Sequence, residues 1–266
     1  IYPSWSRFGF NLESGHALEA ARRVAHSGGK LALVGVHSHI GTFMMDPAAY
    51  KRAAKKLADF YKKVRDELRQ PMQYIDIGGG FVSASKLKST YFSGSSLLPS
   101  FDQYAEAICS ALYDSFSPEE PPPLFSESGR AMVDESGFLV STIVGNKTLP
   151  SGKRAMVLNA GLNLLYTSTW YDFKISPVKD YSKAYEDVTL YGPLCMNIDV
   201  VRESCLLPTM SRGDHLVIHP VGAYNVTQWM QFIEMRPAVV MIQQGGNVKE
   251  IRRRETVDDI NAMELE

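Results

Sequence analysis

The first half of the chain alternates apolar segments with amphipathic ones. Residues 30–40 (KLALVGVHSHI) predict a buried strand, and the Asp-Pro pair at 46–47 predicts the start of a helix with one apolar stripe. A second strand is predicted over 73–80, followed by a helix that opens with a capping box at 100–103 and by a third strand running into 126–130. Because parallel strands need long crossovers, this order predicts a parallel sheet with helices.

The pattern changes from about residue 133. Short apolar segments are separated there by Gly, Pro, Asn and Asp, which is typical of an antiparallel sheet. We therefore predict a mixed α/β plus β chain, with an α/β domain over residues 1–132 and a β-domain over residues 133–266.

Composition narrows the classes of partner. The chain has 28 Lys and Arg residues against 29 Asp and Glu, so no strong field favours nucleic acid. Its apolar runs are shorter than the roughly 18 residues of a membrane helix. Its three cysteines lack the paired close spacing of a disulfide framework or a zinc site. These features predict a small-molecule substrate, no membrane partner and a cytoplasmic location.

Two histidines stand near the end of the first predicted strand. His37 and His39 are one residue apart, so both point to the same side of an extended strand, towards the carboxyl edge of the sheet. The alternative interpretation is a hydrogen-bonded core histidine. A metal site would need a third ligand, and no nearby carboxylate or histidine stands out, so we predict no metal.

Glycines and charges follow the next two strands. Gly78 to Gly80 could expose consecutive N–H groups to a phosphate, although they match neither the dinucleotide fingerprint nor the P-loop, and glycine-rich turns are common. Glu127 and Arg130 place an anion and a cation at the end of the third strand, where a surface ion pair is the alternative.

Two residues of the second half are also candidates. Cys195 follows a Gly-Pro turn, although a lone cysteine is more often a small buried hydrophobe than a catalyst. Tyr224 follows Gly-Ala, where its hydroxyl could bind an anion or satisfy a buried backbone group.

In order along the chain, these pieces resemble the family of diaminopimelate and ornithine decarboxylases, which are fold-type III pyridoxal-phosphate enzymes. The resemblance implies the C-terminal part of an alanine-racemase-like (β/α)8 TIM-type barrel over 1–132, followed by a C-terminal antiparallel β-sandwich or barrel. The segments that carry it are SRFGF (6–10), HSHIGT (37–42), IDIGGGF (75–81), PSFDQYAEAI (99–108), ESGR (127–130), NAGLN (159–163), WYDF (170–173), GPLC (192–195), GAY (222–224) and RRRET (252–256).

The resemblance implies pyridoxal 5'-phosphate as the cofactor. It places the His39 ring on the pyridine, and Glu127 at the pyridine nitrogen, where a carboxylate keeps the nitrogen protonated so that the ring can accept electrons as carbon dioxide leaves. The positions that match the family's cofactor ligands are His39, Thr42, Gly78, Gly79, Gly80, Glu127, Gly129, Arg130 and Tyr224.

The resemblance also implies catalytic and substrate residues. With His39 and Glu127, Cys195 would be catalytic, because it matches the residue that protonates the substrate carbon from across a homodimer interface. Tyr171, Asp172 and Met196 fall at substrate positions. The implied function is decarboxylation of a basic or modified diamino acid.

Two departures from the family pattern are informative. The usual Glu-Pro-Gly-Arg is Glu-Ser-Gly-Arg here, which keeps both charges. The residue after the cysteine is normally acidic and binds the distal amino group, but here it is Met196, which cannot pair with an ammonium. Unless Asp172 or Asn197 replaces that acid, we expect a modified or larger substrate, such as a siderophore- or polyamine-type intermediate.

The expected cofactor-binding lysine has no match in this sequence. A full barrel takes about 250 residues, and no segment resembles the family motif Ala-x-Lys-Ala-Asn. We therefore expect that an N-terminal segment, whether cleaved, disordered or encoded as a separate chain, carries this lysine. Two alternatives remain open at this point: an amino-acid racemase or epimerase of the same fold type, and a non-catalytic paralogue that regulates its partners.

Overall fold

The computed structural model describes residues 7–88 and 98–265, so Ser6 of the SRFGF segment lies outside the described residues. The described chain forms two compact units. The first comprises residues 7–84 and 98–132, and the second comprises residues 85–88 and 133–265. None of the helices in this part of the chain is both long and apolar enough to cross a membrane.

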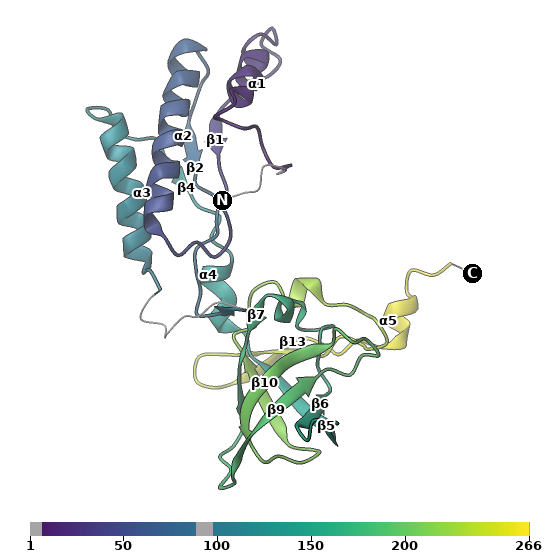
Figure 1. Ribbon diagram of the computed structural model, residues 1–266. Helices are drawn as coiled ribbons and strands as arrows, with labels where there is room; N and C mark the ends of the chain where they lie inside the picture. Colours follow the sequence, from purple (N-terminus) through teal and green to yellow (C-terminus); the bar gives the residue numbers. More distant parts are fainter. Residues whose placement is uncertain (1–6, 89–97, 266) are drawn as a thin grey trace. The chain divides into compact units, whose positions relative to one another are not determined.

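The first unit is built on a parallel three-stranded sheet with the order β1-β2-β4. The helix α2 connects β1 to β2, and α3 lies between β2 and β4 in the chain (Figure 1), which confirms the predicted strand–helix–strand order. The elements are α1 (His16–Ala25), β1 (Gly35–His37), α2 (Pro47–Glu67), β2 (Tyr74–Asp76), α3 (Phe101–Phe116) and β4 (Leu124–Phe125). The short α4 (Arg130–Val133) begins in this unit, and its last residue belongs to the second unit.

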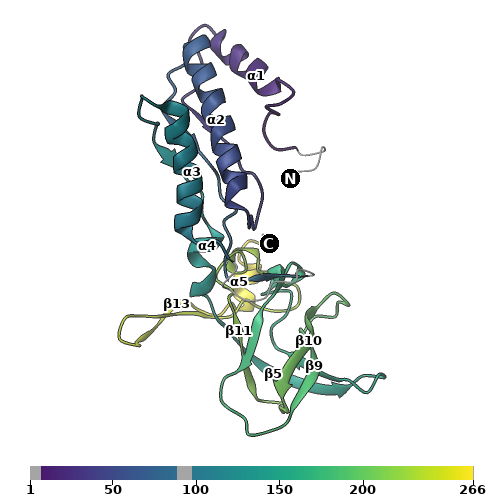
Figure 2. The same cartoon turned by 60° about the vertical axis from the view of Figure 1, so that its left-hand side comes forward.

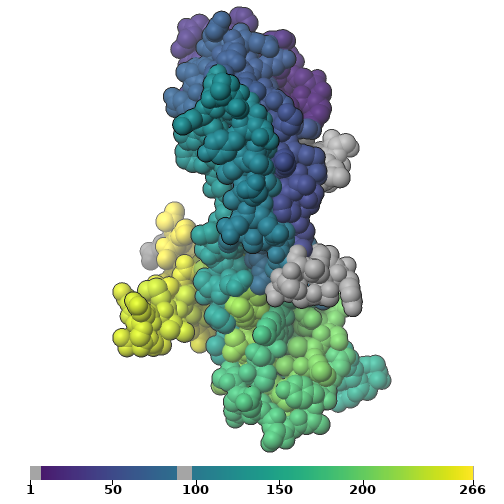
Figure 3. Space-filling view, turned by 90° about the vertical axis from the view of Figure 1, so that its left-hand side faces the viewer, coloured from purple at the N-terminus to yellow at the C-terminus, as the bar shows by residue number. Residues whose placement is uncertain are grey.

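The two long helices begin where the sequence predicts. The Asp46 side chain accepts a hydrogen bond from the Ala48 N–H at 2.9 Å at the start of α2. Ser100 and Gln103 form a reciprocal capping box at the start of α3. Figure 3 shows these helices side by side on the surface of the first unit. Because the caps satisfy N–H groups that a helix leaves unpaired, they fix where each helix starts.

The second unit contains a six-stranded sheet with the order β10-β9-β6-β5-β11-β8. All neighbours are antiparallel except β6 and β9, so the predicted purely antiparallel sheet is wrong at this pair. Residues 159–184 join these two strands, and a connection of that length can return the chain to the same end of the sheet. The strands are β5 (Leu139–Thr148), β6 (Arg154–Leu158), β8 (Lys174–Pro177), β9 (Tyr185–Tyr191), β10 (Val200–Pro208) and β11 (His215–His219).

Large apolar side chains from this sheet form one core, which includes the fully buried Met156, Leu190 and Ile218. Arg202 of the edge strand β10 donates to the Phe173 carbonyl at 3.2 Å, directly before the other edge strand, β8. The two edges of the sheet therefore approach each other.

Smaller elements complete the second unit. Figure 2 shows the hairpin of β12 and β13 extending away from the six-stranded sheet. The β3 strand pairs with β7, which attaches residues 85–88 to this unit. These elements are β3 (Lys86–Leu87), η2 (Asp134–Ser136), η3 (Tyr166–Thr169), β7 (Tyr171–Asp172), η4 (Val226–Gln228), β12 (Val239–Ile242), β13 (Val248–Arg252) and α5 (Val257–Asn261).

Candidate active site

The carboxyl ends of the three parallel strands meet at one edge of the first unit. His37 of β1 is in register with Asp76 of β2, and Asp76 is in register with Phe125 of β4. The strands are shorter than the predicted segments, because the backbone leaves the sheet directly after these residues. The loops that follow carry most of the predicted site residues, so the fold brings His39, the glycine run and Glu127 to the same edge.

The glycine run forms a tight turn against the neighbouring loops. Gly78 and Gly80 have φ angles of 70° and 93°, in the left-handed region that favours glycine. A Cβ at Gly79 would collide with the Glu127 carbonyl oxygen, and the Glu127 N–H donates to the Gly78 carbonyl at 2.9 Å. The absence of side chains therefore lets this turn lie directly against the segment that bears Glu127.

Two of the three glycine N–H groups have partners inside the protein. The Gly78 N–H donates to Asp76 Oδ1 at 2.8 Å, and the Gly79 N–H donates to His39 Nδ1 at 3.1 Å. In the part of the chain that the structure describes, the Gly80 N–H donates to no acceptor. The turn thus offers one free donor to an anion, where the sequence suggested several.

The hydrogen bond from the Gly79 N–H also holds the His39 ring. Because Nδ1 accepts from the Gly79 N–H, the neutral ring carries its proton on Nε2. His39 lies beyond the end of β1 and contacts the glycine turn, whereas His37 contacts Asp76. The two histidines therefore have different partners at the strand edge.

Tyr50 supports the glycine turn from below, and sequence reasoning did not identify it. Its side chain is 0% exposed, and its hydroxyl donates to the Gly79 carbonyl at 2.8 Å. The ring stacks on Phe81 with centroids 4.8 Å apart and contacts Tyr104 edge to face. Burial raises the pKa of the Tyr50 hydroxyl, so it remains a protonated donor at neutral pH. In the sequence Tyr50 is one member of an apolar helix stripe, and nothing marks its hydroxyl.

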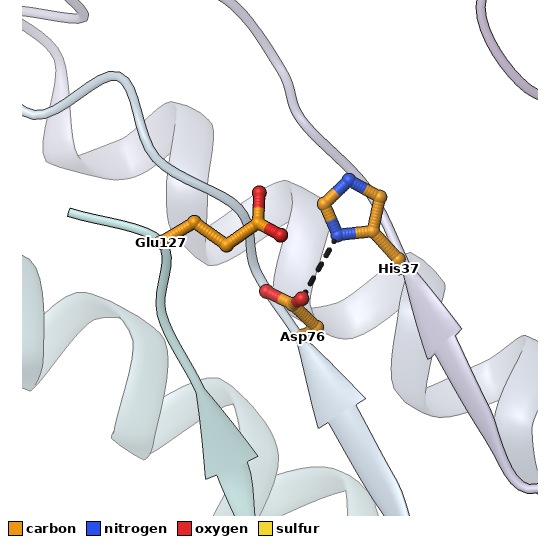
Figure 4. A group of neighbouring side chains, drawn as sticks. All are labelled: His37, Asp76 and Glu127. Atoms are coloured by element: carbon orange, nitrogen blue, oxygen red, sulfur yellow. Dashed lines mark ion pairs between the residues drawn. The ribbon is translucent and has the colours of Figure 1, made fainter. Parts of the chain in front are cut away.

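His37, Asp76 and Glu127 form a cluster at this edge (Figure 4). His37 Nδ1 lies 3.2 Å from Asp76 Oδ2, and the three side chains offer ligand-type atoms that all lie within 4.8 Å of one another. Sequence reasoning found no third ligand near the histidines, but the parallel register supplies two carboxylates. These three side chains are a set that could hold a divalent cation. The predicted absence of a metal from this chain therefore stays a prediction.

The remaining predicted residues of the first unit differ in exposure. Arg130 is only 7% exposed, which argues against a simple surface ion pair with Glu127. Thr42, Glu127 and Gly129 are exposed. The buried Arg130 guanidinium follows the exposed Glu127 by three residues. It places positive charge at this strand edge, where an anionic group could be held.

Predicted residues in the second unit occupy several environments. Asp172 Oδ1 lies 3.3 Å from Arg202 Nη1, and the neighbouring Tyr171 is buried. The Asp172 carboxylate could have taken the role of the acidic residue that the family has at the position of Met196. Here it is already paired with Arg202. Cys195 is exposed, not the buried hydrophobe of the alternative interpretation.

Tyr224 has an unusual backbone. Its φ angle is 66°, which is uncommon for a residue other than glycine, and its side chain is 47% exposed. The buried Asp134 fixes the preceding turn, because its carbonyl accepts the Gly222 N–H at 2.9 Å. Strained residues held by their surroundings often cluster at functional sites.

Comparison with known families matches both units. Residues 4–134 match the family described as "Pyridoxal-dependent decarboxylase, pyridoxal binding domain". Residues 90–222 match "Pyridoxal-dependent decarboxylase, C-terminal sheet domain".

Curated relatives carry one recurring name. The chain is 27% identical to the diaminopimelate decarboxylase of Bacillus methanolicus over 255 residues, covering 94% of this chain and 57% of the relative. It is 28% identical to the enzyme of that name from Methanocaldococcus jannaschii over 262 residues, covering 98% of this chain and 57% of the relative. The chain therefore spans little more than half the length of these relatives.

Solved structures of proteins with the same name are also similar to the chain. The crystal structure of diaminopimelate decarboxylase from M. jannaschii has a TM-score of 0.86 at 27% identity, covering 99% of this chain and 58% of that one. The Helicobacter pylori enzyme complexed with L-lysine has a TM-score of 0.81 at 25% identity, covering 98% and 61%. A viral arginine decarboxylase, with a TM-score of 0.70 at 21% identity, shares the fold, covering 85% of this chain and 58% of that one.

Proposed function

Because the chain belongs to the pyridoxal-dependent decarboxylases, we propose that the protein binds pyridoxal 5'-phosphate and decarboxylates a diamino acid or a derivative of one. The observation that carries this proposal is the edge of the first unit, where His39, the glycine turn and Glu127 follow adjacent parallel strands. The same edge would hold the cofactor beside the carboxyl ends of the parallel strands.

Pyridoxal phosphate, when bound, supplies a ring that accepts the electrons left behind as carbon dioxide departs. Glu127 is exposed and its backbone is tied to Gly78, so its carboxylate can hold a proton on the ring nitrogen. The His39 ring, which accepts the Gly79 N–H, would stack on the pyridine face. These two residues would orient the ring and keep its nitrogen charged.

The phosphate would be held mainly by charge. Arg130 supplies a buried cation, and Gly80 supplies one free N–H. Thr42 and Gly129 are exposed and belong to the same proposed set. Tyr224 of the second unit is also exposed, and we propose it as a phosphate ligand because its position matches that ligand in the family. Since Gly78 and Gly79 use their N–H groups internally, we assign them the role of shaping the turn.

Cys195 is the proposed proton donor to the substrate carbon. Its thiol is exposed on the loop between β9 and β10. This exposure is required of a group that must reach a ligand. We propose a homodimer in which this loop completes the site of the partner, in the cytoplasm, where the cysteine stays reduced.

The substrate is proposed to lack a simple distal ammonium at the position of Met196. An apolar side chain there cannot pair with a charge, and Asp172 already pairs with Arg202. Tyr171 is buried next to Asp172 and would shape the pocket rather than bind charge. A diamino acid whose distal nitrogen is modified, as in siderophore- or polyamine-type intermediates, fits this environment better than free lysine or ornithine.

The test is release of labelled carbon dioxide by the full-length protein supplied with pyridoxal phosphate. Carboxyl-labelled lysine, ornithine, arginine and diaminopimelate are compared with derivatives acylated on the distal nitrogen. We expect release, with a higher kcat/KM for a modified substrate. Racemisation without release would favour a racemase, and no reaction with any substrate would favour a non-catalytic paralogue.

A further inference from the structure

The loop that carries Cys195 joins β9 to β10 and is closed by backbone hydrogen bonds. The Gly192 N–H donates to the Asp199 carbonyl at 3.0 Å, and the Asp199 N–H donates to the Met196 carbonyl at 3.0 Å. Cys195 lies at the exposed part of this loop, while Leu194 and Asp199 are buried. The two residues Leu194 and Asp199 therefore anchor the loop in the protein interior, while the Cys195 thiol is exposed.

The Asp199 carboxylate holds the buried part of this loop by hydrogen bonds. The residue is only 2% exposed, and both carboxylate oxygens accept backbone N–H groups. Oδ2 accepts from Leu194 at 2.8 Å, and Oδ1 accepts from Leu162 at 2.6 Å. Because Leu194 directly precedes Cys195, one of these bonds fixes the backbone at the residue that leads into the thiol.

The surrounding backbone is shaped to admit a carboxylate. A Cβ at Gly161 or at Gly192 would collide with the Asp199 side chain. Asn163, which is also buried, accepts the Gly161 N–H at 3.1 Å and orders the opposite loop. A charge can be buried here because directed N–H donors replace its hydration.

We propose that Asp199 is a positioning residue that sets the place of the Cys195 thiol by holding the Leu194 N–H. This inference rests on the proposed role of Cys195 as proton donor. Asp199 is too buried to reach a substrate itself, so its effect on turnover would act through the loop.

The experiment compares Asp199→Asn with Asp187→Asn in the full-length protein. The introduced amide turns an NH2 group towards the Leu194 or the Leu162 N–H, so one donor loses its acceptor. Asp187 lies on β9 of the same sheet, but its carboxylate is half-exposed and pairs with Lys153 and Ser204. The control therefore makes the same chemical change outside the loop.

Two readouts are needed. Hydrogen exchange of the Leu162 and Leu194 amides should accelerate about tenfold in Asp199→Asn, on the scale of an unsatisfied buried donor, and stay unchanged in Asp187→Asn. The kcat should fall severalfold at unchanged KM, and the ratio of aldehyde to amine product should rise. An aldehyde marks a proton delivered to the cofactor instead of the substrate carbon. Hydrolysis by one water molecule would then release the aldehyde and leave the amino group on the cofactor.

Unchanged exchange at Leu194 would overturn the proposal, as would acceleration throughout the six-stranded sheet, which would mark a general structural role. Local acceleration with wild-type kcat and product ratio would also overturn it. If the wild-type protein releases no carbon dioxide, the proposed function fails, whereas the exchange data still show whether Asp199 holds the loop.

Discussion

Replacing Tyr50 with phenylalanine tests how the glycine turn is held. Tyr50→Phe keeps the ring stacked on Phe81 and removes the hydroxyl that donates to the Gly79 carbonyl at 2.8 Å. A buried hydrogen bond of this kind contributes about 1 kcal/mol. If that energy helps hold the turn in the form that binds the cofactor, its loss weakens the affinity for pyridoxal phosphate roughly fivefold.

Tyr61→Phe is the matched control for this prediction. Tyr61 lies on the same helix, α2, and its buried hydroxyl donates to the Met72 carbonyl, also at 2.8 Å. Both variants should lower the melting temperature by a similar ~2–4 °C. Cofactor affinity, measured by titration of protein fluorescence, should fall for Tyr50→Phe alone. Equal affinities for the two variants would refute the idea that Tyr50 acts through the turn.

Three further outcomes are expected. Glu127→Gln should lower turnover more than tenfold, on the scale of a lost charge-assisted hydrogen bond, whereas Glu119→Gln, at an exposed ion pair with a helix arginine, should match wild type. Iodoacetamide should label Cys195 well before Cys205, because burial raises the pKa of the Cys205 thiol and limits access; equal labelling rates, read by peptide mass, would contradict this. Met196→Asp should raise kcat/KM for free diamino acids relative to modified ones, and an unchanged ratio would show that residue 196 does not contact the distal group.

Much of the fold of the first unit could be predicted from local signals. The Asp46 and Ser100 caps fix the starts of α2 and α3, and helical crossovers between apolar segments require parallel strands. The short helix α1 matches none of the predicted segments. The parallel pairing of β6 with β9 depends on how the long connection through β7 and β8 returns the chain to the sheet, and the periodicity of the strands does not reveal that path.

The candidate site could be predicted only in part. Motif order identifies His39, the glycine run and Glu127, because those residue types and spacings recur in a known family. The cluster of His37 with Asp76 depends on strand register, which sets residues 39 positions apart side by side. Likewise, Asp199 acts on Leu162 across 37 residues of sequence, and only the folded chain shows that contact.

The most direct test of the central claim, that this strand edge binds the cofactor through its ring and its phosphate, is a binding titration. The full-length protein is titrated with pyridoxal phosphate and, separately, with pyridoxal, which lacks the phosphate. The buried cation of Arg130 and the Gly80 N–H predict saturable binding of pyridoxal phosphate at least about tenfold tighter than that of pyridoxal. Equal affinities, or no saturable binding of pyridoxal phosphate, would contradict the account.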